Sequence, residues 1–141
     1  MRYRIPEIAA LLFVLFSSPV LASEITVYKS PTCTCCEGWI GYVRAHGFTA
    51  KIVETDDLDA VNAKWHVPDD LRSCHTATVD GYVIEGHVPA EAINKMLAEK
   101  PHVIGIAVPG MPQGSPGMPG DPVPFTVFSF GPDGEKPYMQ F

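Results

Sequence analysis

The sequence has no surplus of basic residues. Its 141 residues include 10 lysines and arginines against 16 aspartates and glutamates, and the two signs are interspersed along the chain. A surface that binds nucleic acid needs clustered positive charge, so general nucleic-acid binding is excluded. The sequence also shows no internal repeat and no separate second domain, and its hydrophobic fraction of 46% is typical of one globular domain.

The sequence also has no apolar run long enough to span a membrane, which takes roughly 20 residues. The N-terminal run covers only residues 8–16; it follows Arg2 and Arg4 and precedes a small-residue site that ends at Ala22. This order is typical of a cleaved export signal. We therefore expect residues 1–22 to be a signal peptide that is removed, residues 23–141 to be a single domain without a stable membrane anchor, and the periplasm to be the destination.

Alternating and helical spacing of apolar residues predicts the order β-α-β-α-β-β-α for most of that domain. The expected elements are strands at 25–28 and 48–53, helices at 37–46 and 58–65, a hairpin at 76–79 and 82–84, and a helix from Pro89 to about Lys100. With a right-handed crossover between the first two strands, this order predicts an α/β fold, a thioredoxin-like mixed sheet flanked by helices. A ferredoxin-like or other α+β arrangement is the alternative.

The last forty residues have a different composition. Proline and glycine fill ten of the sixteen positions from 109 to 124, which predicts a loop without regular structure. The apolar segment 103–108 before this loop has no assigned type. Residues 125–130 and 138–141 predict a C-terminal β-hairpin that turns at 131–134.

The sequence has only four cysteines, and they occur in two places. Cys33, Cys35 and Cys36 lie in the loop before the first predicted helix, and Cys74 directly precedes the predicted hairpin. In a thioredoxin-like fold these places are neighbours, so all four sulfur atoms are expected together. Two structural disulfides are one interpretation, because exported domains often contain them. They are disfavoured because a bridge between adjacent cysteines is strained and the other pairings staple little chain.

A dithiol redox site is a second interpretation. Cys33 and Cys36 have C-x-x-C spacing at a helix N-terminus, where backbone N–H groups and the helix dipole stabilise a thiolate. Reversible disulfide exchange would follow. Two features count against it: Cys35 and Cys74 lie close enough to trap the disulfide, and His75 stands where thioredoxins usually carry a proline.

A metal site is the third interpretation, and it uses all four cysteines. Thiolates are soft ligands that select Cu(I), zinc or iron–sulfur centres, and sulfurs this close in sequence can bridge several Cu(I) ions. Structural zinc sites commonly use two separated C-x-x-C pairs, so the packed C-x-C-C pattern favours copper. The predicted metal ligands are Cys33, Cys35, Cys36 and Cys74.

Other side chains are weaker candidates for this site. They are His75, which adjoins Cys74, the loop residues Met111 and Met118, and, weaker still, His87. The two methionines have an equally good alternative, which is to fill apolar gaps beneath the loop.

Four segments of the sequence resemble one known family. They are YKSPTCTCC (28–36), SCHT (73–76), GYVIEGHVP (81–89) and PGMPQGSPGM (109–118). In this order they are similar to the CopG-type periplasmic copper-resistance family, which was long catalogued as a metal-binding domain of unknown function. Thr34 and Glu37 depart from it, because relatives often have glycine at these positions.

The resemblance implies a thioredoxin-like domain that binds copper through Cys33, Cys35, Cys36 and Cys74. We expect a periplasmic protein of copper resistance and homeostasis that holds Cu(I) in a multinuclear thiolate site. Interconversion of Cu(I) and Cu(II), which would make it a copper oxidoreductase, stays open. A thiol-disulfide oxidoreductase that uses Cys33 and Cys36 is the alternative. The expected partners are copper ions and other periplasmic copper-handling or redox proteins.

Overall fold

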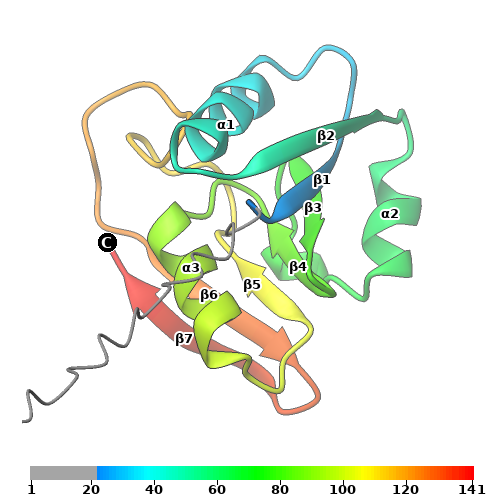
Figure 1. The fold of residues 1–141 in the computed structure, drawn as a ribbon, viewed down its shortest axis with the longest axis vertical. Coiled ribbons are helices and arrows are strands. Elements are labelled where there is room, and N and C mark those ends of the chain that lie inside the picture. The colour runs from blue at the N-terminus through cyan, green and yellow to red at the C-terminus, as the bar shows by residue number, and fades with distance from the viewer. Residues whose placement is uncertain (1–21) are drawn as a thin grey trace, which may run out of the picture.

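The computed structural model describes residues 22–141. Its centre is a seven-stranded mixed sheet (Figure 1). The expected signal peptide lies outside the described residues except for Ala22. The elements are β1 (Glu24–Lys29), α1 (Thr34–Ala45), β2 (Thr49–Glu54), α2 (Leu58–Lys64), the 3-10 helix η1 (Asp69–Leu71), β3 (His75–Val79), β4 (Tyr82–Glu85), α3 (Ala90–Glu99), β5 (Gly105–Ala107), β6 (Thr126–Gly131) and β7 (Gly134–Gln140). None of the helices in this described part is long and apolar enough to cross a membrane.

The strand order in the sheet is β2-β1-β3-β4-β5-β6-β7. β1 pairs in parallel with β2 across the α1 crossover and antiparallel with β3, and β3 and β4 form the predicted hairpin. β5 then pairs in parallel with β4, and the β6–β7 hairpin extends the sheet beyond it. The predicted thioredoxin-like mixed sheet with a C-terminal hairpin is confirmed.

Helices cover both faces of the sheet, as side-chain alternation along the strands shows. Ile84 and Ile106 belong to the larger apolar cluster, which α1 and α3 also supply. Their neighbours Val83 and Ala107 belong to a second cluster, with Leu71 of η1. Successive residues of a strand point to opposite faces, so α1 and α3 lie on one face while η1 and the end of α2 close the other.

Some boundaries differ from those expected. Helix α1 begins at Thr34 rather than at residue 37. The sequence did not predict this start because the N-cap residue, Cys33, forms no side-chain capping hydrogen bond and is not a residue type that marks a helix N-terminus. Pro89 is the N-cap of α3 and not its first helical residue. Strand β7 begins at Gly134, four residues before the expected start, and the unassigned segment 103–108 contains the short strand β5.

Candidate metal centre

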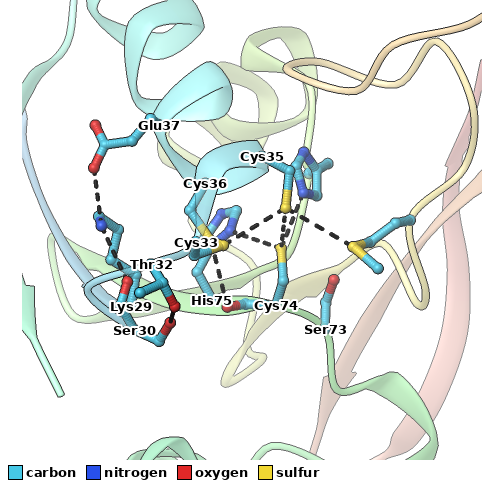
Figure 2. The surroundings of a disulfide bond; sticks show 12 residues. Lys29, Ser30, Thr32, Cys33, Cys35, Cys36, Glu37, Ser73, Cys74 and His75 are labelled. Atoms are coloured by element: carbon cyan, nitrogen blue, oxygen red, sulfur yellow. Dashed lines mark hydrogen bonds and ion pairs between the residues drawn. A yellow bond between two sulfur atoms is a disulfide. The ribbon is translucent and has the colours of Figure 1, made fainter. Parts of the chain in front are cut away.

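The four cysteines meet at one end of the sheet. Cys33 is the N-cap of α1, Cys35 and Cys36 lie in its first turn, and Cys74 directly precedes β3. Because β1 and β3 are antiparallel with Lys29 opposite His75, the loop that leaves β1 starts beside the residue that enters β3. Figure 2 shows the four sulfur atoms turned toward one another. These atoms all lie within 4.8 Å of one another.

Two of these cysteines form a disulfide and two are free thiols. The disulfide joins Cys33 to Cys36, and Cys35 and Cys74 are unbridged. The Cys35 sulfur lies 3.5 Å from that of Cys33 and 3.7 Å from that of Cys74. The structure therefore has one disulfide, between the two C-x-x-C cysteines, and not the two structural disulfides of the first interpretation.

Two histidines approach the Cys74 sulfur. His75 Nδ1 lies 3.3 Å from it and His87 Nε2 lies 3.0 Å from it, and both rings are fully buried. The separation between Cys74 and His87 is thirteen residues in sequence, and the β3–β4 hairpin brings them together. His87 was the weakest sequence candidate, yet the structure places it at least as close as His75.

Burial keeps these three groups uncharged near neutral pH. It raises the pKa of the Cys74 thiol to about 12, with a further contribution from Cys35. It lowers the pKa of His75 to about 3, with the neighbouring His87 as the second cause, and it lowers the pKa of His87. A metal ion that binds here meets two neutral imidazoles and must displace the thiol proton.

The proline- and glycine-rich loop brings one methionine to the cysteines. Met111 Sδ lies 4.0 Å from the Cys35 sulfur, and Met111 is 51% exposed. The backbone carbonyl of the preceding Gly110 accepts a 2.7 Å hydrogen bond from the Ser73 hydroxyl. Met118, within the part of the chain that is described, has no such contact to a cysteine; its N–H donates to the Ser115 carbonyl.

The same loop packs tightly on α1. A Cβ at Gly117, where φ is +84°, would lie 2.7 Å from the Gly38 carbonyl carbon and 2.8 Å from Trp39 Cα. The adjacent Pro116 carbonyl accepts a 2.7 Å hydrogen bond from His87 Nδ1. The glycine is therefore required for the approach that holds the loop against His87.

Replacing Gly117 by alanine is expected to lower the free energy of unfolding by at least about 2 kcal/mol, because left-handed backbone and overpacking both add cost. Gly110→Ala is the matched control: its φ is +70°, but its Cβ would meet no atom within 4 Å. It is expected to cost only about 1 kcal/mol. Urea unfolding of the two variants measures the difference, and equal losses would contradict the close approach.

Sequence reasoning missed a buried carboxylate behind Cys74. Glu85 Oε1 accepts a 2.7 Å hydrogen bond from the Ser73 N–H, and its Oε2 accepts one of 2.7 Å from the Thr76 hydroxyl and a longer one from Asn62. Burial raises the pKa of Glu85 to about 7. Its only sequence signal is an acid at the end of an apolar strand. The carboxyl fixes the backbone directly before Cys74.

An ion pair between a buried lysine and an exposed glutamate fixes the other side of the cysteine loop. Lys29, at the end of β1, is 1% exposed and its ammonium lies 2.9 Å from the Glu37 carboxylate (Figure 2). Its ammonium also donates to the Ser30 carbonyl at 3.1 Å. Glu37 thus ties the first turn of α1 to the strand that precedes it.

This chain is similar to one described family and to two solved structures. Residues 71–118 match a family described as "Protein of unknown function, DUF411", and no curated protein matches the chain. A solved structure described as "Copper resistance protein copG- Form 2" is 36% identical to this chain, with a TM-score of 0.80. The match covers 85% of this chain and 98% of the chain in that structure. The chain belongs to the CopG family. A second CopG structure, "Form 1", is 37% identical with a TM-score of 0.78 and covers 84% and 96% of the two chains.

The CopG matches extend over nearly the whole described chain, so they include both groups of cysteines and the loop. The family resemblance expected from the four sequence segments is thereby confirmed. The DUF411 match begins at Leu71 and ends at Met118, a span that contains Cys74, both buried histidines and Met111.

Proposed function

We propose that this CopG-family protein binds copper ions as its cargo and serves copper resistance and homeostasis in the periplasm. The observation that carries the proposal is the gathering of four cysteine sulfurs within 4.8 Å of one another. The two solved relatives, both described as copper resistance proteins, support the same metal. The proposed ligands of a multinuclear Cu(I) site are Cys33, Cys35, Cys36 and Cys74.

The donor atoms favour Cu(I) over harder metal ions and over zinc in a structural site. Thiolates and thioethers select Cu(I), and here a methionine sulfur adjoins the cysteine group. Zinc in structural sites takes a closed tetrahedron, commonly from two separated pairs of ligands. Three of the four cysteines here come instead from four consecutive residues, and Cys35 Sγ has two other cysteine sulfurs within 3.7 Å. Such crowding suits sulfurs that bridge metal ions.

Full use of the site requires reduction of the disulfide. Two electrons and two protons convert the Cys33–Cys36 bridge into two thiols, which then lose their protons as Cu(I) binds. Interconversion of Cu(I) and Cu(II) would make this copper-binding protein a copper oxidoreductase. It needs an electron partner, so periplasmic redox or copper-handling proteins are the proposed partners.

Native mass spectrometry of the anaerobically reduced protein tests the proposal, with Cu(I) supplied through a competing chelator. We expect several Cu(I) ions to bind cooperatively per chain. Cys35→Ser and Cys74→Ser should each lower this number, whereas Met118→Leu, which alters a sulfur without a cysteine contact, should not. Unchanged copper stoichiometry in both cysteine variants would contradict a clustered site.

Thiol-disulfide exchange is the second candidate, favoured by the disulfide itself. Cys33 and Cys36 are already paired at the N-terminus of α1, where a thiolate is stabilised. This function predicts a measurable dithiol potential and reduction of a disulfide substrate by the Cys35→Ser/Cys74→Ser double variant. Copper binding predicts that the same double variant loses its cargo.

A further inference from the structure

Lys29 carries a buried positive charge that the proposed copper site does not use. Its side chain is 1% exposed, and its ammonium lies 2.9 Å from the carboxylate of Glu37, which is 54% exposed. Lysine is almost never fully buried, because moving its charge out of water is costly even when a partner is present. A neutral side chain of similar length would fill the same space at a lower cost. The charge itself is therefore the feature that indicates a function.

Hydrogen bonds join the Lys29 ammonium to the turn that carries Cys33. The Ser30 carbonyl accepts a 3.1 Å hydrogen bond from the ammonium and a 3.2 Å hydrogen bond from the Cys33 N–H. One carbonyl oxygen thus connects the lysine to the first cysteine of the disulfide. Figure 2 shows Lys29 and Glu37 together on one side of the bridge.

The two sulfurs of the bridge differ in their access to solvent. Cys33 is half-buried, whereas Cys36 is fully buried and its sulfur lies 3.5 Å from the Cys74 carbonyl oxygen. A reductant therefore attacks the Cys33 sulfur, and Cys36 is the sulfur that leaves. In thiol–disulfide exchange the displaced sulfur leaves as a thiolate. Neither water nor a carbonyl oxygen stabilises this negative charge, so it depends on the dipole of α1 and on nearby fixed charges.

Glu37 places a negative charge at the end of α1 where both bridged cysteines lie. It follows Cys36 directly and stands one helical turn beyond the N-cap residue, Cys33. A carboxylate in the first turn of a helix interacts favourably with the helix dipole, but it repels a thiolate at the same end. The Lys29 ammonium offsets that repulsion, because it is paired with this carboxylate.

We propose that the Lys29–Glu37 ion pair sets the rate at which a dithiol reduces the Cys33–Cys36 bridge. Lys29 favours the negative charge that arises on the departing sulfur, and Glu37 opposes it. One reductant sulfur attacks Cys33, and the bridge breaks as Cys36 leaves with the electron pair. The second reductant sulfur then displaces Cys33. The reductant becomes a disulfide, and its two protons pass to the two protein thiols.

The ion pair would thereby control how readily the site opens for copper. Reduction frees two of the four proposed copper ligands, so this consequence rests on the proposed function. The charge effect on the bridge does not require copper, and it is measured on the metal-free protein.

The test measures the second-order rate constant for reduction of the bridge by dithiothreitol. The background is the Cys35→Ser/Cys74→Ser double variant, in which the bridge contains the only cysteines, and new thiols are counted by mass spectrometry after alkylation. We expect Lys29→Met to slow reduction and Glu37→Gln to speed it, each by at least about threefold, which is the effect of one ordinary charge pair. Combining both substitutions should return the rate close to that of the background.

A purely structural role predicts a different pattern. Lys29→Met and Glu37→Gln break the same ion pair, so a loosened turn would change the rate in the same direction in both variants. Glu37→Lys keeps the test decisive if Lys29→Met fails to fold, because Glu37 is exposed. Reversal of its charge should speed reduction more than Glu37→Gln does. Shifts in one direction, or equal rates for the two Glu37 variants, would overturn the proposal.

The ion pair between Lys95 and Glu99 on α3 is the matched control. Its length is also 2.9 Å, and its two members contact Tyr138 and not the cysteine loop. Lys95→Met and Glu99→Gln should leave the rate of reduction unchanged. Rate changes as large as those at Lys29 and Glu37 would show that any charge on the surface has this effect, and the proposal would be wrong.

Cu(I) binding by the reduced wild-type protein is measured in parallel. If several Cu(I) ions bind while the ion-pair variants show no opposite shifts in rate, the charge effect is wrong and the proposed function stands. If the opposite shifts occur while the reduced protein binds no Cu(I), the copper function is wrong and the charge effect stands.

Discussion

Closing the Cys33–Cys36 disulfide is expected to weaken Cu(I) binding by more than about 100-fold relative to the reduced protein. The bridge removes two of the four thiolates that converge in the site, and disulfide sulfurs carry no negative charge for the metal. Even groups that only support metal ligands contribute 10- to 100-fold in affinity, so about 100-fold is a lower bound for two ligands. Competition with a Cu(I) chelator under anaerobic conditions, before and after reduction, measures the change.

The Cys33→Ser/Cys36→Ser double variant is the control for this experiment. It cannot form the bridge and lacks the same two thiolates, so its weak Cu(I) affinity should match that of the oxidised protein and should not respond to reductant. An oxidised wild-type protein that loads as many Cu(I) ions, as tightly, as the reduced one would contradict the thiolate site.

Glu85→Gln is expected to stabilise the metal-free protein by about 3 kcal/mol at pH 8 and to change little at pH 4.5. Burial raises the pKa of Glu85 from 4.5 to about 7, so the folded protein binds this proton more tightly than the unfolded chain. Stability therefore falls as pH rises between these two values, by roughly 1.4 kcal/mol per pH unit. Glutamine imitates the protonated acid and removes that loss.

Urea unfolding of the disulfide-bonded, metal-free protein between about pH 4.5 and 8 measures this prediction. Glu91→Gln, at an exposed glutamate in the first turn of α3, is the matched control and should follow the wild-type pH profile. A Glu85→Gln profile parallel to that of the wild type would show that Glu85 is already ionised at low pH in the folded protein.

Local signals were sufficient to predict most of the fold. The apolar alternation in β1 and the hairpin of β3 and β4 depend on near neighbours in sequence, and the structure has both. β5 could not be assigned because it has only three residues and becomes a strand by pairing with β4 and β6 on either side.

The sequence predicts that the four cysteines lie together, but it does not predict which histidine and methionine side chains lie beside them. Spacing places Cys33, Cys35 and Cys36 together, and the fold brings Cys74 to them. Nothing local relates His87 to Cys74, because their approach depends on hairpin register and on the loop carbonyl of Pro116. The sequence treats Met111 and Met118 alike; only the path of the loop places Met111 beside Cys35.

The exposure of Met111 bears on the rate at which copper would exchange at the proposed site. This thioether is 51% exposed while its sulfur lies against Cys35, so the donor group has one edge open to solvent. If copper binds there as proposed, an incoming soft ligand would reach the ion at that edge before the buried bonds break. Copper exchange would then be associative, with a rate that rises with acceptor concentration, and a tightly bound ion could still be passed on quickly.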